Sequence, residues 1–164
     1  MTDLGILPHL AGIGMSLAGF AGLISALLRG PGEWRPFDVI AIRAQVSYGF
    51  ATVLLALIPI PLAGVIGVDV ALRTAAIALF AFAIVWGYIG SRDSRRAKLP
   101  LRRRLPFLAI APLQLATAVW AIFDPRLAVY ELALITLLAY TMPVFFLALL
   151  EGRGRAAELP HSND

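Results

Sequence analysis

Long apolar stretches alternate with short polar ones along the whole chain. Five stretches of 18 or more residues contain no Asp, Glu, Lys or Arg; they cover residues 4–28, 44–68, 74–91, 105–123 and 132–150. An uncharged apolar run of this length is typical of a helix that crosses the hydrocarbon core of a bilayer. The pattern predicts an all-α polytopic membrane helix bundle with five transmembrane helices, over residues 4–28, 39–62, 70–89, 105–123 and 127–150.

The composition supports this prediction and excludes several other classes of protein. The 164 residues are 60% hydrophobic and 15% charged, whereas soluble domains are about 45–50% apolar and about 25% charged. The chain has no cysteine, so it is no disulfide scaffold. Five spans leave only short loops and ends, which excludes a separate soluble catalytic domain. We expect residues 1–150 to form one bundle and residues 151–164 to be a polar, disordered cytoplasmic tail.

The basic residues predict how the bundle is oriented. Seven of the 14 lie in the loop between the third and fourth spans: Arg92, Arg95, Arg96, Lys98, Arg102, Arg103 and Arg104. Basic residues in short loops mark the cytoplasmic side, so five spans place the N-terminus outside and the C-terminus in the cytoplasm of a bacterial inner membrane. The loop is either a topology determinant alone or a site for anionic lipid headgroups at Arg102, Arg103 and Arg104. This placement argues against a nucleic acid as partner.

Small residues recur every four positions along the first predicted helix. They are Gly14, Ala18, Gly22 and Ala26. A ridge of small side chains lets a second helix backbone approach closely, which is how helices associate in lipid. The second helix belongs either to the same chain or to another copy of it, in which case the ridge is the seam of a homo-oligomer.

Polar residues near the midplane are candidates for a solute or ion pathway. Gln114, Tyr140, Thr141, Ser16 and Thr52 fall at similar depths on four predicted helices. An unpaired polar group is costly in hydrocarbon, so these side chains must meet one another or water. They therefore form either interhelical hydrogen bonds or a small polar site.

Charged residues lie near both ends of the predicted spans. Asp38, Arg43 and Gln45 at the inner end either line a vestibule or combine a helix cap with an arginine that extends to the headgroups. Asp69, Arg73 and Glu131 at the outer end form either an ion pair between helices or a charge that recognises a substrate.

The sequence has few of the residues that enzymes use. His9 and His161 are the two histidines, and neither has a carboxylate or a second histidine at the spacing of a metal site. We therefore expect no enzyme, no metal and no cofactor. The first interpretation is a small homo-oligomeric channel or transporter for a small solute or ion. The alternatives are a non-catalytic accessory subunit of a larger membrane complex and a membrane enzyme that acts on a lipid-like substrate.

The predicted orientation can be tested with a cysteine placed in the loop between Arg92 and Arg104. We expect this cysteine to resist membrane-impermeant thiol reagents in intact cells, because the loop lies in the cytoplasm. Labelling after the cells are opened is the control. Ready labelling in intact cells would reverse the orientation.

Overall fold

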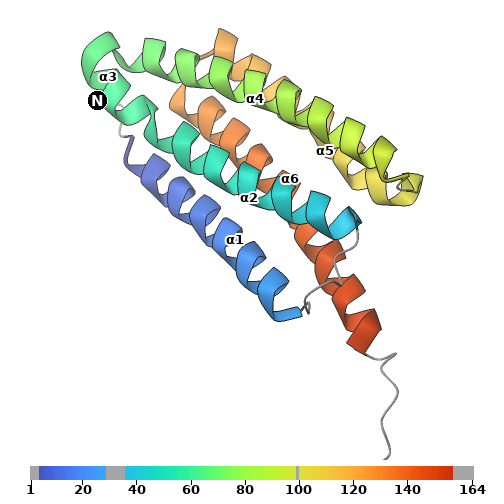
Figure 1. Ribbon diagram of the computed structural model, residues 1–164. Coiled ribbons are helices and arrows are strands. Elements are labelled where there is room, and N and C mark those ends of the chain that lie inside the picture. Colours follow the sequence, from blue (N-terminus) through green and yellow to red (C-terminus); the bar gives the residue numbers. More distant parts are fainter. Residues whose placement is uncertain (1–3, 29–35, 99, 157–164) are drawn as a thin grey trace, which may run out of the picture.

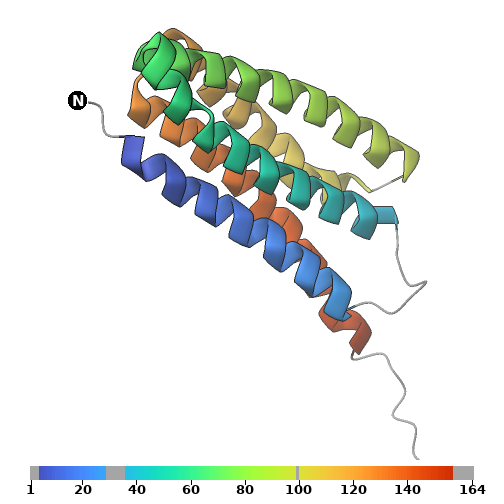
Figure 2. The same ribbon diagram turned by 60° about the vertical axis from the view of Figure 1, so that its left-hand side comes forward.

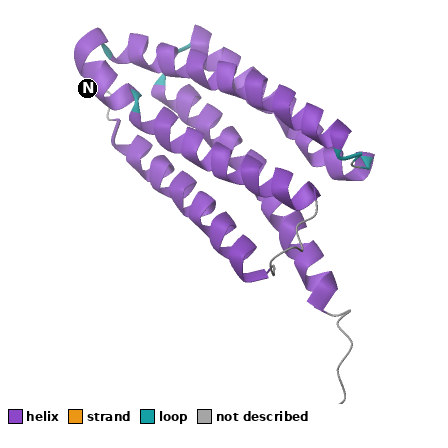
Figure 3. Ribbon diagram, viewed as in Figure 1, coloured by secondary structure: helices purple, strands orange, loops and turns teal. Residues whose placement is uncertain are grey.

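The computed structural model describes residues 4–28, 36–98 and 100–156, and this part of the chain is helical with no β-strand (Figures 1 and 3). Six α-helices follow a short 3-10 turn. In chain order the elements are η1 (Leu4–Ile6), α1 (Leu7–Leu28), α2 (Pro36–Leu57), α3 (Pro59–Ile66), α4 (Val68–Arg96), α5 (Leu101–Phe123) and α6 (Leu127–Ala156). The prediction of an all-α fold is confirmed for the described residues.

The long helices run alternately up and down (Figures 1 and 2). Four of them form a ring in which α2 contacts α4 and α6, and α5 contacts the same two helices. Helix α1 lies outside this ring and packs mainly on α2. We call the end of the bundle where α4 finishes, at Arg95 and Arg96, the basic end; the opposite end carries α3 and the turn between α5 and α6.

Each of the five predicted spans overlaps a helix, but the described residues form six α-helices and several boundaries differ. Helix α4 extends from residue 68 to 96, beyond the predicted 70–89, and α6 continues to residue 156, so residues 151–156 of the predicted tail are helical. Residues 157–164 lie outside the described part. The predicted span 39–62 is divided, because α2 ends at Leu57 and α3 begins at Pro59.

Pro59 explains the break between α2 and α3. The backbone stays in the α-helical region at Ile58, and its N–H donates to the Leu54 carbonyl over 2.9 Å. Pro59 has no N–H, so the carbonyl of Leu55 loses its helical partner. The hydroxyl of Tyr130 on α6 donates to this carbonyl over 2.6 Å, in a buried position. The kink is thus stabilised by a hydrogen bond between two helices.

The contact between α1 and α2 depends on glycines. A Cβ atom on Gly49 would lie 2.7 Å from the Cβ of Ala18 and 2.7 Å from the carbonyl oxygen of Gly14. A Cβ on Gly14 would lie 3.0 Å from the Gly49 carbonyl oxygen. The two backbones therefore approach as closely as small residues allow. Two members of the predicted ridge, Gly14 and Ala18, contact a helix of the same chain.

Two helical segments are long and apolar enough to cross a membrane. They are Val39–Ile66, which comprises most of α2 with α3, and Val68–Arg96, which is α4. Shorter apolar segments, of 10–17 residues, lie in the described parts of the other long helices: Leu4–Phe20, Leu108–Phe123 and Leu127–Thr141. By length and composition, the structure supports membrane association through two helices, and the five-span arrangement stays a prediction.

The close contact at Gly49 gives a test of the α1–α2 packing. We expect Gly49→Ala to lower the free energy of unfolding by about 1–3 kcal/mol, because an added methyl group overpacks the contact. Gly19→Ala is the matched control, since its Cβ meets nothing within 4 Å. The control should be neutral or stabilising by up to about 1 kcal/mol, because alanine favours helix more than glycine does. Titration with SDS in mixed micelles measures both; equal effects would contradict the packing.

The hydrogen bond at the kink gives a second test. We expect Tyr130→Phe to lower the free energy of unfolding by about 1–3 kcal/mol, because it leaves the buried carbonyl of Leu55 without a partner. Tyr88→Phe is the control, since Tyr88 is exposed. The same SDS titration measures the difference, and indistinguishable midpoints for the two variants would show that the bond adds no stability.

Candidate functional site

Buried polar side chains gather in the middle of the bundle. Among the described residues they are Gln45, Thr52, Gln114, Thr117, Thr136 and Thr141. The four threonines donate to carbonyls of their own helices; for example, Thr52 donates to Tyr48 over 2.9 Å and Thr141 to Leu138 over 2.6 Å. Such bonds satisfy a hydroxyl without a partner from another helix.

Threonines also join α5 to α6. The hydroxyl oxygens of Thr117 and Thr136 lie 3.0 Å apart and are both buried. Each hydroxyl lies within 3.0 Å of carbonyls of its own helix as well. The pair fixes the level at which α5 and α6 face each other.

Two tyrosines form the contact between α2 and α6. The rings of Tyr48 and Tyr140 are stacked, with centroids 4.5 Å apart and planes 16° from parallel. Phe82 of α4 meets the Tyr48 ring edge-on at 5.3 Å. Tyr48, only 2% exposed, thus contacts two other helices of the ring.

Two glutamine amides near these tyrosines lack a partner. The Nε2 atoms of Gln45 and Gln114 are buried and make no hydrogen bond, and the residues are 3% and 2% exposed. Leaving a buried donor unpaired costs about 1–3 kcal/mol. Native interiors contain few such groups, and each calls for a physical explanation such as a bound water or ligand.

Helix geometry places both amides close to the tyrosine pair. Gln45 lies one turn before Tyr48 on α2. Gln114 lies one turn before Thr117, and Tyr140 one turn after Thr136 on the antiparallel α6, so Gln114 and Tyr140 lie at one level. We name these residues, with Thr141, the tyrosine-centred cluster: Gln45, Tyr48, Gln114, Thr117, Thr136, Tyr140 and Thr141.

The chemistry of the cluster is suited to hydrogen bonds with an uncharged group. It contains amide and hydroxyl groups but no Asp, Glu, Lys, Arg or His. Its two unpaired atoms are N–H donors, which a carbonyl or hydroxyl oxygen of a ligand would satisfy. In the described residues no group of three or more metal-ligating side chains is present.

An arginine at the basic end connects α2 with α4. The guanidinium Nη1 of Arg43 lies 3.6 Å from Oδ2 of Asp93, and its Cζ lies 5.5 Å from the ring centroid of Trp86. Trp86 is in turn stacked on Phe82 at 5.9 Å. The side chains of Arg43 and Asp93 are 58% and 27% exposed, so solvent screens their attraction.

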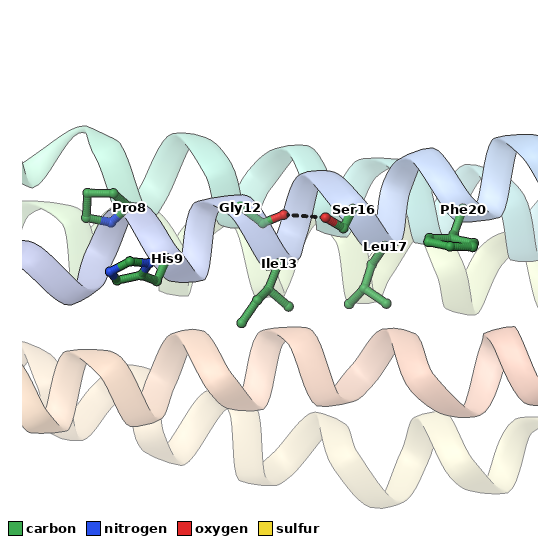
Figure 4. Close-up of a pocket in the computed structure, with 7 residues that line it drawn as sticks. All are labelled: Pro8, His9, Gly12, Ile13, Ser16, Leu17 and Phe20. Carbon is green, nitrogen blue, oxygen red and sulfur yellow. Dashed lines mark hydrogen bonds between the residues drawn. The ribbon is translucent and has the colours of Figure 1, made fainter.

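Ser16 and Thr52 lie outside the cluster. Ser16 is exposed and donates to the Gly12 carbonyl of its own helix. Ser16 lines an open groove of about 610 Å³ along α1, where Ile13 and Leu17 point toward the ribbon of α6 (Figure 4). Thr52 is buried, but it lies against the α1–α2 contact, since its Cβ would be 3.0 Å from a Cβ on Gly14.

The predicted outer-end charges do not pair with one another. Asp69, Arg73 and Glu131 are all described, and no salt bridge joins any two of them. The ion pair at this end joins Arg126 Nε to Asp124 Oδ1 over 3.0 Å, in the turn between α5 and α6. Asp69 and this pair line a cleft of about 360 Å³.

Several predicted residues lie where the structure does not describe the side chain. They are Asp38, Ala26, Arg102, Arg103 and Arg104. Gly22 is described and exposed, and a Cβ there would meet nothing within 4 Å. Of the three predicted inner-end residues, the structure therefore describes the side chains of two. Arg43 pairs with Asp93, and Gln45 lies in the cluster.

Sequence reasoning did not single out Tyr48, Phe82, Trp86, Asp93, Thr117 or Thr136. Aromatic residues in apolar helices resemble ordinary core or interface residues, so spacing alone gives no sign of the contacts between helices. The recurrence of Gln45 and Tyr48 on one helical face is the only signal that could have drawn attention to Tyr48.

No protein-family model matches the chain, and no curated protein and no solved structure is significantly similar to it.

Proposed function

We propose that the chain is a five-span bacterial inner-membrane protein that provides a pathway for a small uncharged polar solute. The apolar exterior supports the membrane part of this proposal. Only 33% of the most apolar window of each of the two long helical segments is buried, whereas the core helix of a soluble protein is mostly buried. Large apolar side chains such as Leu54, Ile77 and Ile84 are exposed, and lipid would cover them.

The single observation that carries the pathway is the pair of unpartnered amides at Gln45 and Gln114. In a bundle surrounded by lipid, bulk water does not reach these N–H groups. Their hydrogen bonds must then come from a single bound water molecule or from an oxygen atom of a solute. Helix geometry puts both glutamines within about one turn of the level of the stacked rings of Tyr48 and Tyr140. This arrangement favours a solute site in the middle of the bundle.

The chemistry of the cluster favours an uncharged solute. A buried ion needs a compensating charge, because its desolvation cost is several kcal/mol, and the cluster has no ionisable acid or base of ordinary pKa near neutrality. Amides and polyols offer the carbonyl or hydroxyl oxygens that the two N–H groups need. Ions and protons are therefore poorer candidates than the solutes of this class.

The proposed pathway runs within one chain. Gly14 and Ala18 contact Gly49 of the same chain, so the close-packing part of the ridge on α1 is already occupied. The ring of α2, α4, α5 and α6 surrounds Gln114 and the tyrosine pair without a second copy.

A membrane accessory subunit is the second candidate, and the outward face of α1 favours it. A Cβ on Gly12, Gly19 or Gly22 would meet nothing within 4 Å, so this face is open to a helix of another protein. The native mass of the protein extracted gently from its membrane separates the candidates. Other chains in the particle would favour the accessory subunit, and the single chain or its oligomer would favour the pathway.

Solute flux tests the proposed pathway. We expect proteoliposomes of the protein to swell faster in glycerol or urea than protein-free vesicles do, and Gln114→Leu to reduce the added rate about tenfold. A tenfold loss corresponds to about 1.4 kcal/mol, which is the usual contribution of one hydrogen bond. Ile77→Leu, on the lipid side of α4, is the control and should keep the rate. Equal rates for wild type, Gln114→Leu and empty vesicles would overturn the proposal.

A further inference from the structure

A continuous series of contacts leads from the basic end into the tyrosine-centred cluster. Asp93 pairs with Arg43, and the Arg43 guanidinium lies over Trp86. The series then passes along three aromatic contacts, in the order Trp86–Phe82, Phe82–Tyr48 and Tyr48–Tyr140, with centroid distances of 5.9, 5.3 and 4.5 Å. It joins α2, α4 and α6, which are three of the four helices of the ring.

The contacts restrict how Tyr48 can move. The ring of Phe82 makes a T-shaped contact with the Tyr48 ring, and Tyr140 covers a face of it. Phe82 is itself held by the face of Trp86, so Tyr48 cannot move toward α4 unless Trp86 moves as well. Interiors are too densely packed for a buried ring to move without its neighbours. The position of Tyr48 therefore depends on Trp86.

The series begins at the basic end with the Arg43–Asp93 ion pair, and this ion pair can open readily. With 58% and 27% of the two side chains exposed, solvent screens the pair, which makes it weaker than a buried pair. The guanidinium adds a cation–π contact with Trp86. Together they give a contact that holds Trp86 in place and can still be broken.

We propose that Arg43, Asp93 and Trp86 form a latch that keeps Tyr48 and Tyr140 stacked at the level of Gln114. When the latch opens, Trp86 and Phe82 move and the tyrosine pair separates, which makes the position of Gln114 more accessible. The latch rests on the proposed function, because it regulates the same pathway. Its state can be measured without any solute, which keeps the two proposals separable.

The absence of native cysteine allows a direct measurement. Gln114→Cys places a single thiol in the cluster, and its rate of reaction with a charged methanethiosulfonate reagent in detergent-solubilised protein reports how accessible that position is. We expect Arg43→Ala and Asp93→Asn, each added to Gln114→Cys, to raise this rate about 3- to 10-fold. Arg43→Ala removes both a screened ion pair and a cation–π contact, whose loss changes an equilibrium by about this factor, whereas Asp93→Asn removes the ion pair alone and should lie at the lower end of the range.

The exchange of the two charges tests the pairing itself. The double variant Arg43→Asp with Asp93→Arg restores the ion pair across α2 and α4, and we expect it to return the rate at least halfway to that of the parent protein. Arg95→Ala is the matched control, since it removes an exposed positive charge from the same end of α4 without contact with Trp86. It should leave the rate unchanged.

Each result decides the proposal. Faster reaction in both single variants, with restoration by the exchange, supports the latch. Equal rates in all variants, or equal acceleration by Arg95→Ala, overturn it. Far-ultraviolet circular dichroism shows whether each variant keeps its helices, and Asp93→Asn, which preserves the shape of the side chain, serves if Arg43→Ala unfolds. A latch that responds in a protein without solute flux would refute the proposed function alone.

Discussion

The stacking of Tyr48 on Tyr140 is the contact on which the arrangement of this bundle depends. It brings α2 against α6, and the edge of Phe82 adds α4 to the same point. In the proposed membrane setting, no hydrophobic force between lipid and a helix selects one neighbour over another, so specific contacts between side chains decide how the helices pair. Here these contacts are aromatic, and they lie at the level where the buried polar groups gather.

The other contacts of α2 follow from the same need for specific packing. On one side its backbone meets α1 at Gly49, where the absence of a side chain allows the approach. At its far end the Leu55 carbonyl, freed by Pro59, receives the hydroxyl of Tyr130. Helix α2 is thus fixed by a glycine contact, a ring contact and a hydrogen bond, each with a different helix or a different part of α6.

The polar groups inside the bundle differ in how they are satisfied. The threonine hydroxyls bond to carbonyls of their own helices and cost little to bury. The amides of Gln45 and Gln114 each have an N–H donor left over. That difference between hydroxyl and amide is the reason that the glutamines, and not the threonines, carry the functional proposal.

The sequence by itself predicted the helical class and the order of the long helices, because the length of an apolar run is a local property of the chain. It also drew attention to Gln114 and Tyr140, because a polar group buried in an apolar helix is costly. It also predicted a close-packing ridge at Gly14 and Ala18. Only the tertiary structure decided which helix the ridge meets, that Ser16 faces outward, that Asp69 and Arg73 stay apart, and that Arg43 joins Asp93 and Trp86. These depend on how each helix is rotated and on which helices become neighbours, and the periodicity of a single helix contains no information about its partner.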